Sequence, residues 1–204
     1  MATLPRLIED EYIVLSQEEL DRLSGLSLEE FLALPEVKPA LEYVEGRVTQ
    51  KVSPQGKHSA LQTGLAELVN GICRPARIAR AFTELRFRGL RASQVPDVSV
   101  YRWERIPRDP DGTVANVFTE LPDVGVEILS PGQSRREQVE KCLGFLARGA
   151  RVALFVDDER KTITVFRPGQ EPAAMRAGDV IDLTDAVPDL SLSVNEVFGA
   201  LRLD

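Results

Sequence analysis

The chain has 204 residues, of which 43% are hydrophobic and 28% are charged, a composition that suits one folded domain and excludes global disorder. The formal net charge of −7 excludes a polycation that coats nucleic acid by charge alone, but it is compatible with an enzyme whose basic residues gather on one face. The two cysteines, Cys73 and Cys142, are too few for a disulfide framework and form no metal-binding CxxC pair.

The sequence contains no signal for export or membrane insertion. No segment has the basic-then-apolar form of a signal peptide, and no apolar run approaches the ~18 residues of a membrane span. We therefore expect a cytoplasmic protein with no membrane partner, in which both cysteines are small buried side chains.

The predicted elements begin with a helical region over 16–34, in which Ser16 and Ser27 precede acidic residues as helix N-caps do. Two strands around a turn follow over 41–52, because Gly46 tolerates the positive φ that such a turn needs. The next predicted element is a helix over 58–70. Its apolar stripe consists of Leu61, Leu65, Leu68 and Val69.

The middle of the chain is predicted to be rich in strands. The predicted strands cover 78–82, 83–88, 95–101 and 123–129. In the strand over 95–101, Asp97 and Ser99 face one way and Val98 and Val100 the other. The strand over 123–129 places Glu127 on one of its faces by the same alternation.

The last part of the chain is predicted to alternate between helices and strands. A helix over 135–148 carries an apolar stripe of Val139, Cys142, Leu143 and Leu146. The nearly all-apolar strand over 152–156 is expected to be buried on both faces. The remaining predicted elements are strands over 162–166 and 179–183 and a helix over 194–201.

Two carboxylates on predicted strands suggest a metal site. If the strands that carry Asp97 and Glu127 are neighbours, both side chains converge on one side of the sheet. Two hard oxygen ligands, completed by a backbone carbonyl and water, are what Mg²⁺ prefers. Spacing alone favours the alternative, in which both acids are strand-end charges that form local salt bridges.

Two further residues are open to both a functional and a structural interpretation. Lys141 can stabilise negative charge near a metal, or it is a solvated lysine lying off the main apolar stripe of its helix. His58 is the only histidine and is a candidate general base, or it forms hydrogen bonds near the start of its helix. No GxSxG elbow, phosphate-binding loop or dinucleotide fingerprint is present.

Arginines are concentrated in one region with a single acid, Glu84. They are Arg74, Arg77, Arg80, Arg86, Arg88 and Arg91. Such a cluster suits the phosphates of a nucleic acid, and it equally suits a solvated surface balanced by acids elsewhere.

The order of the motifs resembles a known family. The motifs are LEYVEGR at 41–47, Ser53 and Pro54, His58, VPDVSV at 95–100, VEILSP at 126–131, Lys141, and LFVD at 154–157. This order resembles the Uma-type restriction endonuclease family, a branch of the PD-(D/E)XK nuclease superfamily. The resemblance implies an α/β (α+β) fold with a mixed β-sheet core flanked by helices. The expected organisation is an N-terminal extension over 1–26 and a single nuclease-like domain over 27–204.

The resemblance also implies a catalytic site. Asp97, Glu127 and the carbonyl of Ile128 would hold Mg²⁺ or Mn²⁺, and Lys141 would take the role of the lysine that usually stands where this chain has Leu129. Glu42 matches an upstream acid of the family, with Glu45 as its rival. The residues expected to contact DNA are Arg80, Arg86, Arg88 and Arg91.

The chain departs from the family pattern near the lysine. Glu137 and Gln138 stand where the family often has an Asp-Arg pair, and Phe145 stands where it often has tyrosine. We expect the protein to be a metal-dependent DNA endonuclease. A homodimer is compatible with this function. The alternatives are a nucleic-acid-binding module on the same fold that no longer cuts, and a structural or oligomerising protein.

Overall fold

In the computed structural model, which describes residues 12–203, the chain divides into two compact units. Among the described residues, the first unit comprises 12–53 and 86–95, and the second comprises 54–85 and 96–203. The partition expected from the sequence, an extension over 1–26 and one domain over 27–204, stays a prediction about which segments fold independently. Residues 1–11 of that extension lie outside the described part of the chain.

The first unit begins with two short helices, α1 (Gln17–Leu23) and α2 (Leu28–Leu32). Each starts with a capping box. A serine hydroxyl accepts a hydrogen bond from the backbone N–H three residues later, and the glutamate side chain at that later position accepts one from the backbone N–H of the serine. The serines are Ser16 and Ser27, as the sequence predicts. The structure thus confirms both predicted caps, with the helical region broken in two between them.

The sheet of the first unit has the order β2-β1-β5-β4. Its strands are β1 (Leu41–Val44), β2 (Arg47–Gln50), β4 (Phe87–Arg88) and β5 (Ala92–Gln94). Glu45 and Gly46 join β1 to β2 with φ angles of 49° and 90°, the positive pair that a tight two-residue hairpin requires. The predicted hairpin is therefore confirmed.

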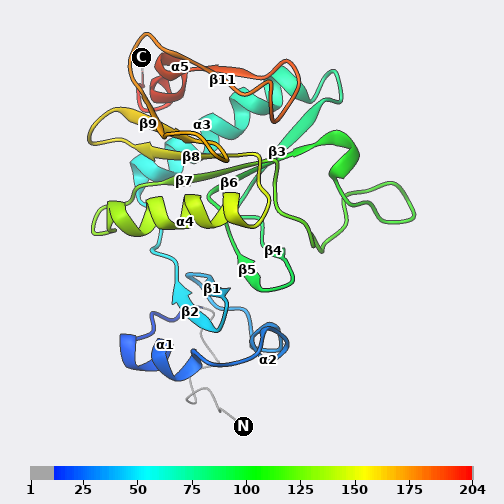
Figure 1. The fold of residues 1–204 in the computed structure, drawn as a ribbon, viewed down its shortest axis with the longest axis vertical. Helices are drawn as coiled ribbons and strands as arrows, with labels where there is room; N and C mark the ends of the chain where they lie inside the picture. The colour runs from blue at the N-terminus through cyan, green and yellow to red at the C-terminus, as the bar shows by residue number, and fades with distance from the viewer. Residues whose placement is uncertain (1–11, 204) are drawn as a thin grey trace. The chain divides into compact units, whose positions relative to one another are not determined.

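The second unit is built on a six-stranded sheet of order β10-β9-β8-β7-β6-β3 (Figure 1). Its strands are β3 (Ala79–Thr83), β6 (Val98–Arg102), β7 (Val124–Ile128), β8 (Val152–Asp157), β9 (Thr162–Phe166) and β10 (Ala173–Met175). Its helices are α3 (Gly56–Cys73), α4 (Arg135–Ala147) and α5 (Val194–Gly199). The unit also contains the 3-10 turn η1 (Trp103–Arg105) and a two-stranded sheet of β11 (Val180–Asp182) and β12 (Ser191–Ser193).

Helices cover both faces of this sheet. Strands β7 and β8 run parallel and are joined by α4, whereas the other neighbours are antiparallel. The valines of β6 and β7 pack with Leu61 and Leu65 of α3 in the main core, while Gly125, on the opposite face of β7, lies against Phe145 of α4. Figure 1 accordingly shows α4 in front of the sheet and α3 behind it. Strand β8 is buried along its whole length, as predicted.

The edge strand β3 has part of its open side covered by a side chain of α3. Asn70 Nδ2 donates to the Ala81 carbonyl at 3.2 Å, and the Ala81 N–H donates to Asn70 Oδ1 at 2.9 Å. The amide thereby satisfies both main-chain groups that a neighbouring strand would otherwise use.

Several expectations about local structure differ from the structure. The strand predicted over 95–101 begins only at Val98, so Asp97 lies just before β6. The strand predicted over 83–88 is interrupted, because Glu84 has a φ of 51° and leaves the extended conformation. Strands β10 and β12 were not expected, since both are only three residues long.

Within residues 12–203, no helix combines the length and the apolar character needed to cross a membrane.

Gly64 allows α3 and α5 to approach closely. A Cβ at this position would overlap the Cβ of Ala200, whereas a Cβ at Gly71 on the same helix would meet nothing within 4 Å. We expect Gly64→Ala to lower the free energy of unfolding by about 1–3 kcal/mol through overpacking. Gly71→Ala should instead raise it by up to about 1 kcal/mol through helix propensity.

Urea denaturation of both variants measures these two effects. Adding Ala200→Gly to Gly64→Ala should restore stability, because it removes the other half of the overlap. A stabilised Gly64→Ala single variant would show that the two helices are not in contact there.

Candidate active site

The strand pairing of the second unit brings Asp97 and Glu127 opposite each other. Strands β6 and β7 pair as Val98↔Val126 and Ser99↔Gly125, so the pairing continued by one residue sets Asp97 against Glu127. Residues that lie opposite in an antiparallel pair share a face, with their Cβ atoms about 4.5–5.5 Å apart. Each residue is only 2% exposed. Two carboxylates are thus held side by side in a buried part of the sheet.

The ladder between β6 and β7 ends at this point. Leu129 donates its N–H to Val156 of β8, so the preceding residue, Ile128, directs its main-chain groups to the β6 side. Two residues before the start of β6 stands Pro96, which has no N–H to donate to a neighbouring strand. The Ile128 N–H donates instead to Oδ2 of Asp97 at 2.7 Å.

Helix α3 holds Asp97 from a second direction. His58 Nε2 lies 3.0 Å from Asp97 Oδ2, and Gln62 Nε2 donates to the Asp97 carbonyl oxygen at 2.8 Å. The same Gln62 amide donates to Glu84 Oε1 at 2.8 Å. Both the side chain and the main chain of Asp97 are therefore fixed by the first two turns of this helix.

Lys141 of α4 contacts one of these two carboxylates, that of Glu127. Its Nζ lies 2.9 Å from Glu127 Oε2, and the lysine side chain is 14% exposed. Because the ammonium pairs with a buried carboxylate on the same face as Asp97, the structure places all three predicted residues together.

The orientation of α4 differs from the one its apolar residues predict. The buried residues of the helix are Gln138, Cys142 and Phe145, whereas Leu143 of the predicted stripe is 47% exposed. Gly125 explains the difference, since a Cβ there would lie 2.9 Å from the Phe145 ring, and its absence lets that ring settle on the sheet. The rotated helix brings Lys141 to the sheet, although Lys141 lies off the apolar stripe.

An ion pair fixes the start of α4. Arg135 Nε donates to Asp157 Oδ2 at 2.7 Å, and the N–H of Arg160 donates to Asp157 Oδ1 at 3.0 Å. Burial alone would raise the pKa of the Asp157 carboxyl, but these hydrogen bonds outweigh burial and hold the pKa below its ordinary value. Asp157 therefore stays ionised and ties α4 to the end of β8.

The two carboxylates create a negative potential within the fold. Burial raises the pKa of the Cys142 thiol well above its ordinary value, and the charges of Glu127 and Asp97 raise it further. The thiol is consequently protonated and unreactive, and its hydrogen bond to the Leu154 carbonyl fits a packing role.

The donor atoms suit a hard divalent cation. Among residues 12–203, no three His, Cys, Asp or Glu side chains cluster closely enough to hold a metal ion by themselves. A site here would therefore use the two carboxylates of Asp97 and Glu127, with a main-chain carbonyl and water completing the shell. Mg²⁺ is often bound in this way, with few protein carboxylates and several waters. The Ile128 carbonyl is a candidate for the additional position, since Ile128 directly follows Glu127 and its N–H already contacts Asp97.

The predicted upstream acids belong to the first unit. Glu42 is 5% exposed, and its Oε1 accepts from the Val95 N–H at 2.7 Å, while Lys51 Nζ donates to the Val95 carbonyl at 2.9 Å. Glu45 is exposed in the turn after β1, 4.0 Å from Arg91. Glu42 thus holds a peptide group within its own unit, and a catalytic role for either acid stays a prediction.

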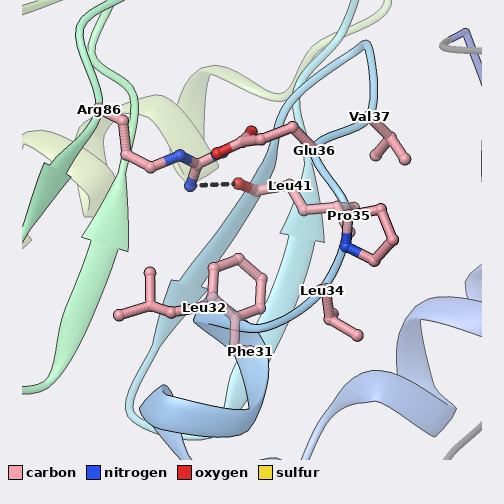
Figure 2. A pocket seen from close by; sticks show the side chains of 8 residues that line it. All are labelled: Phe31, Leu32, Leu34, Pro35, Glu36, Val37, Leu41 and Arg86. Carbon is pink, nitrogen blue, oxygen red and sulfur yellow. Dashed lines mark hydrogen bonds and ion pairs between the residues drawn. The ribbon is translucent and has the colours of Figure 1, made fainter. Parts of the chain in front are cut away.

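The predicted DNA-contacting arginines differ in their surroundings. Arg86 lies in the pocket of Figure 2, where Nη1 donates to the Leu41 carbonyl at 2.9 Å and Nη2 to Glu36 at 3.2 Å. The Arg80 guanidinium lies 4.9 Å from the centre of the Phe82 ring. Arg88 and Arg91 are exposed on the β4–β5 hairpin. Of the four, these last two have side chains open to solvent.

Sequence reasoning did not single out Gln62, Gly125 or the Arg135–Asp157 pair. One feature could have revealed Gln62: it lies four residues after His58 and is a polar residue beside the apolar stripe of its helix. The role of Gly125 depends on the ring that packs over it, which the sequence of the strand does not show.

Comparison with known proteins agrees with this architecture. The sequence model of the Uma2 family, described as "Putative restriction endonuclease", matches residues 28–195. The chain belongs to the Uma2 family.

A solved structure supports the Uma2 assignment. It is the crystal structure of a "putative nuclease belonging to DUF820" from Anabaena variabilis, with 41% sequence identity and a TM-score of 0.81. The match covers 87% of this chain and 99% of that one. The chain therefore has the mixed α/β fold of a nuclease-like protein, which confirms the expected fold class and family.

Other comparisons add nothing to this assignment. A match to the cryo-EM structure of a DrdV–DNA complex, at 13% identity and a TM-score of 0.31, covers 60% of this chain and 12% of that one, too weak a likeness to bear on fold or function. No curated protein matches the chain.

The Arg135–Asp157 pair predicts an acid-dependent stability. Because the folded pKa of Asp157 lies below its unfolded value, its contribution is present above about pH 4 and is lost as the pH falls through the folded pKa. We expect Asp157→Asn to lower the free energy of unfolding by about 1–3 kcal/mol at pH 7. The difference from wild type should shrink below about pH 4.

Urea denaturation at several pH values measures this effect. Glu140→Gln is the matched control, because Glu140 pairs with Arg136 at 2.8 Å with both side chains exposed, and such pairs contribute at most about 1 kcal/mol. A loss for Asp157→Asn that is the same at pH 3 and pH 7 would contradict a role for charge.

Proposed function

We propose that the protein is a metal-dependent DNA endonuclease that hydrolyses phosphodiester bonds at Asp97, Glu127 and Lys141. The observation that carries the proposal is the meeting of two buried carboxylates, Asp97 directly before β6 and Glu127 on β7, with an ammonium 2.9 Å from Glu127 Oε2. Burying such charges costs stability, so a fold that keeps them together is expected to use them. Membership of the Uma2 family, described as "Putative restriction endonuclease", supports this reaction class.

Asp97, Glu127 and the Ile128 carbonyl would hold Mg²⁺ or Mn²⁺. When bound, such a cation supplies positive charge to a phosphate oxygen and makes water a better nucleophile at neutral pH. In the overall reaction a water oxygen forms a bond to phosphorus and the bond from phosphorus to one ester oxygen breaks, so one phosphomonoester and one hydroxyl result.

Lys141 provides the second positive charge of the proposed site. Its ammonium is held by Glu127 Oε2, which limits the directions in which the long side chain can point. An ammonium fixed in advance in a buried site stabilises negative charge more strongly than one in water. In this proposal Lys141 offsets the charge that develops on the phosphate and orients the attacking water.

The interactions around Asp97 support the proposed ligand role. The Ile128 N–H fixes one oxygen of its carboxylate, and Gln62 fixes its main chain. A ligand held in this way loses little conformational freedom when a cation binds. Glu42 as an upstream acid, a homodimeric state and a cytoplasmic location stay predictions.

Cleavage assays test the proposed reaction. Supercoiled plasmid and single-stranded DNA, incubated with Mg²⁺ or Mn²⁺, should be cut by wild type. Asp97→Ala should abolish cutting, and Lys141→Ala should slow it by about 10²–10³-fold, as expected for loss of one charge-stabilising donor. Arg136→Ala is the matched control, since Arg136 lies on the same helix with an 87% exposed side chain paired with Glu140.

Two outcomes would contradict this proposal. Cutting that persists in Asp97→Ala would exclude the site, and absence of cutting with either metal would favour a module that binds DNA without cleaving it. Cutting by Lys141→Ala at the rate of Arg136→Ala would remove Lys141 from the mechanism while leaving the carboxylates in place.

Salt-dependent binding tests the role of the β4–β5 hairpin. Arg88 and Arg91 are exposed, and two phosphate contacts would contribute about 1.8 to the slope of log K against log salt concentration. We expect Arg88→Ala with Arg91→Ala to flatten that slope in Mg²⁺-free DNA-binding assays. Arg22→Ala, an exposed arginine of α1, should leave it unchanged. An unaltered slope in the double variant would show that this hairpin does not contact DNA.

A further inference from the structure

His58 and Gln62 form a pair of contacts around Asp97 that the proposed reaction does not use. They lie four residues apart on α3, so their side chains leave the same face of the helix. His58 contacts the carboxylate of Asp97 at 3.0 Å and Gln62 its carbonyl oxygen at 2.8 Å. One helix thus determines both the rotation of the Asp97 side chain and the position of its main chain.

The hydrogen bonds at Asp97 Oδ2 indicate which ring nitrogen of His58 donates to it. An ionised carboxylate only accepts hydrogen bonds, so Nε2 of His58 is the donor. The N–H of Ile128 donates to the same oxygen at 2.7 Å. Two donors from different elements, a helix and a strand, therefore converge on Oδ2 and restrict rotation of the carboxylate group.

The other ring nitrogen of His58 contributes nothing to this contact. His58 is 6% exposed, and among residues 12–203 its buried Nδ1 has no hydrogen-bond partner. A buried polar atom without a partner costs free energy, which the contact with Asp97 must offset. With Nε2 engaged by a carboxylate and Nδ1 closed to solvent, His58 is poorly placed to take a proton from water.

We propose that His58 is a positioning residue that orients the Asp97 carboxylate for binding the cation. By donating to Oδ2 together with Ile128, it restricts rotation of the carboxylate, and Gln62 keeps the main chain from shifting. The inference rests on the proposed function, because it assigns His58 a role in binding the cation of that site. It replaces the general-base role that the sequence alone left open for this histidine.

Mn²⁺ binding to the full-length, metal-free protein tests the proposal by calorimetry. Glutamine places its amide nitrogen close to the position of a histidine Nε2, whereas the shorter asparagine does not reach it. His58→Gln should therefore bind Mn²⁺ within about threefold of wild type. His58→Asn and His58→Leu should bind it at least about 10-fold more weakly, the loss typical of removing a group that orients a metal ligand.

The amide proton of Ile128 gives a second measurement that needs neither metal nor DNA. Its short hydrogen bond to a charged oxygen should move its NMR resonance downfield. We expect that shift to persist in His58→Gln and to move toward ordinary values in His58→Asn and His58→Leu. His58→Asn and His58→Leu remove the donor by different chemistry. Either variant is sufficient for the test, provided that its circular dichroism spectrum shows that it is folded.

Asp97→Ala in the same titration separates the two proposals. If wild type binds Mn²⁺ and Asp97→Ala does not, the metal site stands, and wild-type affinity in His58→Asn would then overturn the role of His58 alone. If wild type shows no binding that depends on Asp97, the metal site of the proposed function and this inference both fail. Loss of cleavage in His58→Asn with unchanged Mn²⁺ affinity would also overturn positioning, since it would mean that His58 acts in the chemical step.

Discussion

The hydrogen bond from the Ile128 N–H to the Asp97 carboxylate is the interaction on which the candidate site depends. It forms just beyond the last pair of the β6–β7 ladder, Val98↔Val126, where a side chain accepts the bond that a strand carbonyl would otherwise accept. Pro96, two residues before β6, has no N–H with which to continue the ladder. The end of the β6–β7 ladder and the candidate oxygen ligands thus coincide in this fold, and the other elements of the candidate site are arranged around them.

Much of the fold and part of the site follow from patterns in the sequence. Alternation predicts that Asp97 and Glu127 share a face, and the β6–β7 register ends directly beside both residues. The hairpin at Gly46 and the caps at Ser16 and Ser27 follow from local rules that the structure obeys. These features depend on neighbours in the chain, for which a pattern of a few residues is sufficient.

The remainder of the site depends on contacts between distant segments. Counting apolar residues predicts that α4 buries Leu143, whereas the helix buries Gln138 because Phe145 packs where Gly125 has no side chain. The partner of His58 lies 39 residues away along the chain, and no periodicity in α3 identifies it. Local rules fail here at the residues that hold charge in the interior, as is expected where function opposes stability.

The relation between Glu127 and Lys141 shows how a helix can replace a strand position. A lysine two residues after Glu127 would lie on the same face by alternation. This chain has the buried Leu129 at that position. Lys141 arrives from α4, whose start is tied to β8 by Arg135 and Asp157. The position of the ammonium therefore depends on an ion pair at the beginning of the helix as well as on the pair that it forms itself.

Asn70 has a consequence for how copies of this chain can associate. Its single side-chain amide saturates both outward-facing main-chain groups of Ala81, so another chain cannot extend the six-stranded sheet at that point without first displacing it. Edge-to-edge pairing along β3, a common route from a correctly folded sheet to fibrous aggregates, is blocked by one residue of a helix. Association of two copies would have to use surfaces made of side chains, or the opposite edge at β10.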